Sequence, residues 1–119
     1  MKRRMLSAFV IGVMAVAAGS AGAPANQPRT KAQDIKVLAE QSACLKCHAI
    51  DKKVIGPAFR DIAAKYKNDP RARETLREKV KKGGKGNWTE VTGGVLMPPH
   101  SALLPEPLIA QLVDWVLSR

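Results

Sequence analysis

The sequence predicts a small all-α domain, and three observations support this. Apolar residues recur at three- and four-residue spacing in four separate stretches, which is the period of an amphipathic helix. Glycines and prolines separate these stretches. No stretch shows the alternation of β-branched and polar residues that marks a half-buried strand, and no segment repeats another. We therefore expect one domain of about four helices.

The first two helices are predicted over residues 32–44 and 57–67. Pro57 suits the first turn of the second helix, because a proline there loses no intrahelical hydrogen bond. The residues expected to face inward are Ile35, Leu38, Ala39 and Ser42 on the first helix and Phe59, Ile62, Ala63 and Tyr66 on the second.

The third and fourth helices are predicted from end signals. Asn68, Asp69 and Pro70 form a helix start, and Gly83 and Gly84 end that helix after Lys82. The last helix begins within residues 105–107 and ends near Leu117. The expected inward residues are Ala72, Leu76 and Val80 on the third helix and Leu108, Leu112, Trp115 and Val116 on the last.

Six cations of the third helix are expected to point outward: Arg71, Arg73, Arg77, Lys79, Lys81 and Lys82. They form either a solvated face or a docking surface. Lysines in the last turn also complement the helix dipole and need no partner to explain them.

The amino terminus carries the pattern of a secretory signal. Three basic residues at positions 2–4 precede an apolar run over 5–18, and small residues follow. An uncleaved membrane anchor is the competing interpretation, but the run is shorter than the roughly 20 apolar residues that a spanning helix needs. We therefore expect a periplasmic protein without stable membrane insertion.

Cleavage is expected after Ala25, with Ala23 and Ala21 as the alternatives, because a cut after Ala23 would put a proline first. This divides the chain into a signal over 1–25, a flexible lead-in over 26–31 and one domain over 32–119.

The chain is strongly basic. It has 20 Lys and Arg against 10 Asp and Glu, and without residues 1–25 the balance is 17 against 10, a net charge of +7. Such a surface suits nucleic acid, an anionic membrane or an acidic protein. Exported chains rarely meet nucleic acid, and this one lacks an interleaved aromatic platform. We expect a monomer that docks on acidic surfaces of partner proteins and binds no nucleic acid.

The run Cys44-Leu45-Lys46-Cys47-His48 predicts covalent attachment of one haem. Two intervening residues let one helical turn present both thiols to the two vinyl groups, and His48 is then aimed at the iron. A disulfide would close a very short loop and stabilise little. A redox dithiol expects a preceding strand, and zinc would need two further ligands where only His100 is available.

Residues 83–104 form a long segment rich in Gly and Pro, and such segments usually carry function. Within it, Met97 is the candidate sixth ligand of the iron, because it is the one methionine outside the signal and two prolines stiffen the backbone after it. The alternative is that Met97 only fills core. His100 competes for the same position, but its place after the prolines predicts an exposed loop residue. Trp88 either donates its indole N–H to a haem propionate or packs in the core.

These motifs together resemble the short bacterial class I c-type cytochromes, which are periplasmic monohaem proteins. The resemblance covers residues 32–119. It is carried by CLKCH at 44–48, IGPAF at 55–59, IAAKY at 62–66, GKGNW at 84–88, MPP at 97–99 and LVDWVL at 112–117. One departure is the link over 89–96, which looks longer and looser than is usual.

The resemblance implies a class I cytochrome c fold around one haem c. Cys44 and Cys47 would bind its vinyl groups, and His48 and Met97 would ligate the iron. The carbonyl of Pro57 would accept a hydrogen bond from the His48 ring, which fixes the orientation of a metal-bound imidazole. Trp88 would lie near a propionate.

The expected function is one-electron transfer between periplasmic proteins, not catalysis, with Lys46, Lys52, Lys53 and Lys85 around the haem edge. One alternative is a haem subunit of a larger oxidoreductase. Alternatives from other classes are a haem sensor or peroxidase-like enzyme, in which Met97 leaves the iron, and a dithiol protein without haem.

Overall fold

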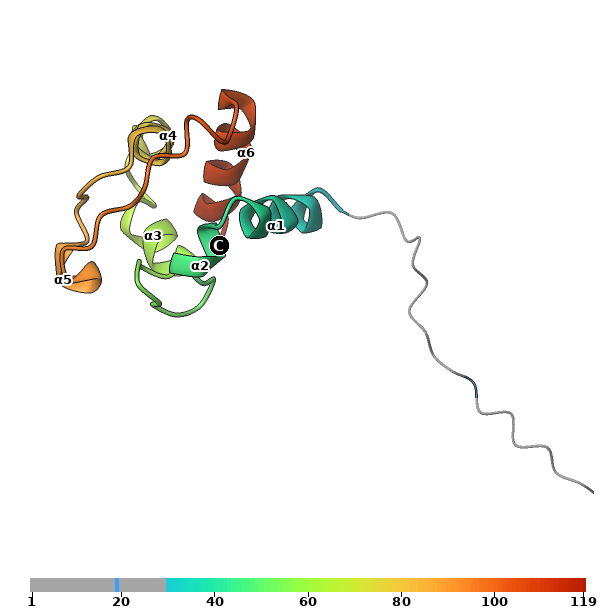
Figure 1. Ribbon diagram of the computed structural model, residues 1–119, viewed down its shortest axis with the longest axis horizontal. Helices are drawn as coiled ribbons and strands as arrows, with labels where there is room; N and C mark the ends of the chain where they lie inside the picture. Colours follow the sequence, from blue (N-terminus) through green and yellow to red (C-terminus); the bar gives the residue numbers. More distant parts are fainter. Residues whose placement is uncertain (1–18, 20–29) are drawn as a thin grey trace, which may run out of the picture.

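The computed structural model describes Gly19 and residues 30–119, and every regular element in this part is a helix (Figure 1). The predicted all-α class is therefore confirmed. Apart from Gly19, the predicted signal lies outside the described residues, and so does the lead-in over 26–29. None of the helices is long and apolar enough to cross a membrane in the part of the chain that is described. The elements are α1 (Lys31–Gln41), α2 (Cys44–Cys47), α3 (Phe59–Lys65), α4 (Ala72–Lys82), α5 (Thr89–Thr92) and α6 (Glu106–Leu117).

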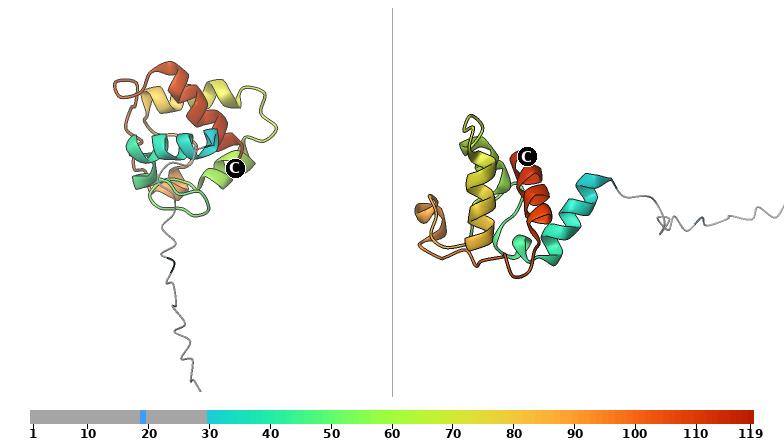
Figure 2. Two further views of the ribbon diagram at one scale, coloured as in Figure 1. Left: turned by 90° about the vertical axis from the view of Figure 1, so that its right-hand side faces the viewer. Right: turned by 90° about the horizontal axis from the view of Figure 1, so that it is seen from above.

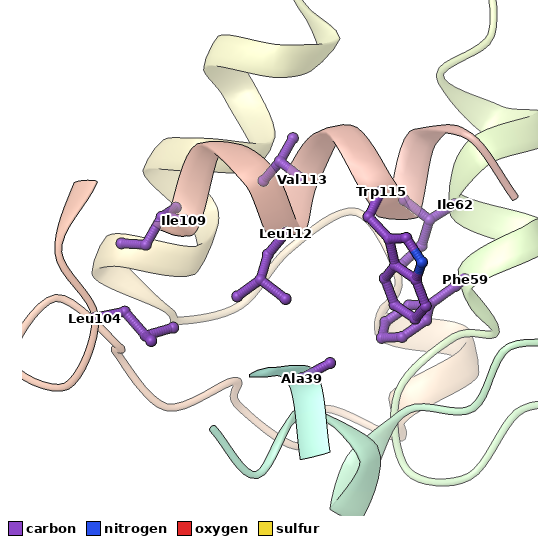
Figure 3. Close-up of a cluster of buried hydrophobic side chains, with 8 residues drawn as sticks. All are labelled: Ala39, Phe59, Ile62, Leu104, Ile109, Leu112, Val113 and Trp115. Atoms are coloured by element: carbon purple, nitrogen blue, oxygen red, sulfur yellow. The ribbon is translucent and has the colours of Figure 1, made fainter. Parts of the chain in front are cut away.

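The carboxy-terminal helix α6 is the centre of the fold, because it packs against α1, α3 and α4 (Figure 2). It contributes half of the buried apolar cluster shown in Figure 3, which comprises Ala39, Phe59, Ile62, Leu104, Ile109, Leu112, Val113 and Trp115. The prediction for its inward face is wrong in two places. Ile109 and Val113 are buried where Leu108 and Val116 were expected, and these two are only half-buried. A helix with three neighbours is apolar over a wide part of its circumference, so the sequence pattern alone does not determine which of its apolar residues are most buried.

The single helix expected over 32–44 is two helices at a sharp turn. Thr30 caps α1, because its hydroxyl accepts from Gln33 N at 3.3 Å while the Gln33 side chain accepts from Thr30 N at 2.8 Å. The helix ends at Gln41, and Ala43 then has a left-handed φ of 62° before α2 begins. That conformation costs about 1–2 kcal/mol in an L-residue. The chain therefore turns at a definite point directly before Cys44.

The helices α3 and α4 begin about two residues later than the end signals predict. In α3, the expected residues Phe59, Ile62 and Ala63 are buried. Before α4, the Asp69 carboxylate accepts from Arg71 N at 2.8 Å, which forms a turn ahead of the first helical residue. Gly83 ends α4 with a φ of 64°, as the predicted stop requires.

Two ion pairs join α4 to α6. Arg73 Nε lies 2.8 Å from Asp114 Oδ1, and Lys81 Nζ lies 3.1 Å from Glu106 Oε2. Exposed as predicted are Arg71, Arg73 and Lys82, whereas Arg77, Lys79 and Lys81 are half-buried, so the prediction that all six cations point outward is wrong in part. Lys79 Nζ donates to the carbonyls of Gly83 and Gly84, and within the described chain the buried Arg77 Nε has no hydrogen-bond partner. Helix ends leave carbonyls without donors, and a lysine one turn earlier can reach them.

Candidate functional site

The two cysteines lie on the single turn of α2. Both thiols are free and half-buried. His48 follows directly, and its backbone N–H donates to Cys44 O at 2.9 Å, which closes the turn. The structure thus brings two thiols and an imidazole together on five consecutive residues, as the motif predicts.

The His48 ring is held by the loop that follows it. Its Nδ1 lies 2.8 Å from the carbonyl oxygen of the buried Pro57. A carbonyl only accepts, so Nδ1 donates and carries the proton. The lone pair of the neutral ring is then on Nε2, for which the described residues supply no hydrogen-bond partner. A metal-ligating imidazole is usually oriented in this way.

Close packing leaves the ring little freedom. A Cβ at Gly56 would lie 2.5 Å from His48 Cε1, so only glycine fits at this position. The ring of Phe59 also stacks on the imidazole, at a centroid distance of 5.3 Å. The amides of Ile55 and Gly56 donate to Cys47 O at 3.1 and 2.7 Å, which folds the loop back onto the motif.

Burial is the main reason why the neutral form of the His48 imidazole is favoured. Burial lowers the pKa of His48, the hydrogen bond to Pro57 raises it, and the charge on His100 lowers it. Burial raises the pKa of the Cys44 thiol, and the nearby Cys47 adds to this. Redox-active dithiols have a lowered thiolate pKa, so this turn is a poor redox dithiol. Of the described residues, no group of three or more His, Cys, Asp or Glu could hold a metal ion such as zinc.

Met97 lies on the segment between α4 and α6 and is half-buried. Its backbone pairs with Gly84 in both directions, with Gly84 N donating at 2.7 Å and Met97 N donating at 3.2 Å. Gly83 permits this approach, because a Cβ there would collide with Met97 O and lie 2.7 Å from the carbonyl carbon of Pro98. The residue is therefore fixed to the end of α4 and not to the Cys44–Pro57 cluster.

Trp88 is half-buried, packs against the apolar cluster and precedes α5, a short helix in the segment expected to be a loop. Lys65 of α3 holds it in place. The ammonium lies 4.3 Å from the indole ring centroid and also donates to Asn87 O at 3.0 Å. Packing against the core is thus part of the role of Trp88, and the expected propionate contact is compatible with it.

The expectation of an exposed His100 is wrong, because its side chain is 6% exposed. The backbone explains this. His100 N donates to Val80 O at 3.0 Å, and its carbonyl accepts from Leu103 and Leu104, so the residue is drawn against α4 at the start of the turn into the core. Its buried Nδ1 has no hydrogen-bond partner in the part of the molecule that the structure describes. The local sequence after two prolines carries no signal for this burial.

The arrangement is typical of proteins that bind haem covalently. Two free thiols on one turn, followed by a neutral imidazole with Nε2 free, fit the covalent attachment of a haem and ligation of its iron. Zinc fits less well because the described residues offer no further ligands, and dithiol chemistry fits less well because the pKa of the Cys44 thiol is raised.

Comparison with known proteins identifies the family. The family model described as cytochrome c matches residues 32–119. Cytochrome c-551 from Allochromatium vinosum is 46% identical over 81 residues, which cover 68% of this chain and 81% of the relative. Cytochrome c-551 from Pseudomonas aeruginosa is 39% identical over 88 residues, covering 74% and 79%. The crystal structure of cytochrome c552 from Nitrosomonas europaea superposes with a TM-score of 0.62 at 37% identity, covering 70% of this chain and 96% of that one.

The chain therefore belongs to the cytochrome c family. It is a small monohaem electron carrier, and its cofactor is a covalently attached haem c.

Proposed function

We propose that this protein is a periplasmic one-electron carrier in which Cys44 and Cys47 would attach the haem and His48 and Met97 would ligate its iron. The observation that carries the proposal is the 2.8 Å bond from His48 Nδ1 to Pro57 O, which leaves Nε2 as the free nitrogen of an oriented ring. The proposed export rests on the signal-like residues 1–25, with 26–31 as a lead-in and 32–119 as the domain.

Each residue has a distinct part in this proposal. When bound, the haem supplies the one-electron iron couple. His48 provides a nitrogen donor whose basicity Pro57 raises. Met97 provides a soft thioether, which favours ferrous iron and raises the reduction potential. If His48 and Met97 both ligate the iron, they would leave no open position for a substrate, so the proposed activity is electron carriage and not catalysis.

The indole N–H of Trp88 is the proposed donor to a haem propionate. Two observations support this: the ring is half-buried, and the Lys65 ammonium lies over it and donates to Asn87 O. These contacts fix the indole at the start of the segment that also contains Met97. A fixed donor loses little side-chain entropy when it makes such a bond.

Docking is proposed at the surface next to the CLKCH turn. Lys46, Lys52 and Lys53 are exposed there, and Lys85 is exposed on the segment after α4. Beside Lys53, the apolar side chains of Val54 and Ile55 are each 43% exposed. Exposed lysines with apolar residues beside them suit brief docking of a monomer on an acidic redox partner, steered by charge and weakened by salt.

The test uses the purified holoprotein. The pyridine haemochrome spectrum should be that of a c-type haem, and the ferric protein should show the red absorption band of methionine-ligated iron. Met97→Ala should abolish this band, because it removes the sulfur. Leu96→Ala is the matched control: its side chain is 61% exposed, and the band should remain. Rapid binding of carbon monoxide by the ferrous wild-type protein would contradict the proposal, because it requires an open iron position.

A further inference from the structure

His100 is a buried imidazole for which the described structure offers no hydrogen-bond partner at Nδ1. An unsatisfied buried polar group costs about 1–3 kcal/mol, so a ring nitrogen in this state calls for an explanation. An apolar residue of similar size would avoid the cost. The unpartnered nitrogen is therefore a candidate donor to a group that the polypeptide itself does not supply.

The backbone anchors His100 at the same end of α4 as Met97. His100 follows Met97 by three residues, and its amide is fixed to Val80 O at 3.0 Å, while Met97 is fixed to Gly84 on the same end of α4. A residue with a nitrogen donor and a residue with a sulfur donor are thus anchored three positions apart at one end of α4.

Lysines are the competing nitrogen donors in this region. Lys79 Nζ already donates to Gly83 O and Gly84 O at 3.2 and 2.7 Å, and Lys85 is exposed. An ammonium must lose a proton before it can bind iron, and lysine in water does so only near pH 10. An imidazole is substantially neutral at pH 7 and binds iron without that cost.

We propose that His100 is a reserve ligand, which takes the sixth position of the haem iron when the Met97 sulfur is lost or displaced. This rests on the function proposed above. In the exchange the Fe–S bond breaks and an Fe–N bond to neutral imidazole forms, with no electron transferred and no proton released. The iron stays six-coordinate and closed to small molecules, and its potential falls because a nitrogen donor replaces the thioether.

The test compares variants of the holoprotein at pH 7. Met97→Ala should lose the red band and yet give a low-spin, six-coordinate ferric spectrum with a lowered reduction potential. The double variant Met97→Ala/His100→Asn should be high-spin. Its ferrous form should bind carbon monoxide about tenfold more tightly or better, because a position occupied most of the time lowers apparent affinity by the open fraction.

Two further variants keep the test decisive. Met97→Ala/Lys79→Gln should remain low-spin, and a high-spin spectrum there would show lysine ligation and overturn the proposal. Met97→Leu keeps the side-chain volume, and it replaces Met97→Ala if the alanine variant does not assemble. A high-spin Met97→Ala protein that matches the double variant Met97→Ala/His100→Asn would also overturn the reserve role of His100. If the wild-type protein still shows the red band in that case, the proposed function stays intact. A wild-type protein without c-type haem would instead overturn the proposed function itself.

Discussion

Gly83 is the position where one methyl group should do most damage to the Met97 side of the site. It has a φ of 64° and a ψ of −143°, a region that L-residues rarely adopt. A Cβ there would collide with Met97 O and lie 2.7 and 2.8 Å from backbone atoms of Pro98 and Pro99. Backbone atoms cannot rotate aside as a side chain does. Gly83→Ala should therefore separate the end of α4 from the Met97 segment.

The expected cost has two parts. Placing alanine in a glycine-only backbone region costs about 1–3 kcal/mol. Overpacking against fixed atoms adds about 1–3 kcal/mol. The sum of about 2–6 kcal/mol is a large share of the about 5–13 kcal/mol expected for a domain of this size.

Gly93→Ala is the matched control, because Gly93 also has a positive φ, 62°, but nothing lies within 4 Å of its missing Cβ. The assay is denaturant unfolding of the holoprotein, followed through the haem absorbance, together with the ferric red band. Gly83→Ala should lose at least about 1 kcal/mol more unfolding free energy than Gly93→Ala, because only Gly83→Ala adds the cost of overpacking. If the two variants are equally stable and keep the same band, the proposed clamp on Met97 is refuted.

Three further predictions concern His48, the core and the α4 surface. Gly56→Ala should lose about 1–3 kcal/mol of unfolding free energy and shift the reduction potential, since its Cβ would lie 2.5 Å from His48 Cε1. The control is Gly86→Ala, whose Cβ would meet only the end of the Lys79 side chain at 3.1 Å, and it should do neither. Similar behaviour of the two variants would count against the close packing of Gly56 on the His48 ring. Ile109→Ala should cost about 2–5 kcal/mol in urea unfolding, because Ile109 is 1% exposed. Its control, Leu103→Ala at 71% exposure, should stay within about 0.5 kcal/mol of wild type, and a larger effect there would contradict the assignment of the core. Hydrogen bonds from Lys82 and Lys81 lower the pKa of Glu78 from 4.5 to about 2, so its contribution to stability is present above pH 4.5 and is lost as the pH falls towards 2. Glu78→Gln should flatten the pH dependence of unfolding in that window, and an unchanged slope would refute this.

The sequence alone predicts the attachment turn well, because its chemistry is contained in five consecutive residues. The end of α4 at Gly83 and the inward face of α3 are likewise local matters of backbone freedom and helical period. The Pro57 contact with His48 could be expected only from the family resemblance, since it joins residues nine positions apart across an irregular loop.

The features that escaped prediction depend on contacts between distant segments. Ala43 has a left-handed φ although nothing in its side chain favours one, so the surrounding structure must impose the turn there. The burial of His100 depends on the carbonyl of Val80, twenty residues earlier. Lys79 looks like a surface cation in the sequence, and its hydrogen bonds to Gly83 and Gly84 depend on how α4 ends.

Residues 89–96 leave the body of the molecule between two fixed points, Trp88 held by Lys65 and Met97 held by Gly84. Val95 and Leu96 in this excursion are 56% and 61% exposed, so they contribute little to the core. Mutation and selection can thus alter the length and chemistry of this stretch while the backbone positions of Trp88 and Met97, the proposed donors to the haem, stay where they are. A lineage could in this way acquire a new redox partner without retuning the midpoint potential of its electron carrier.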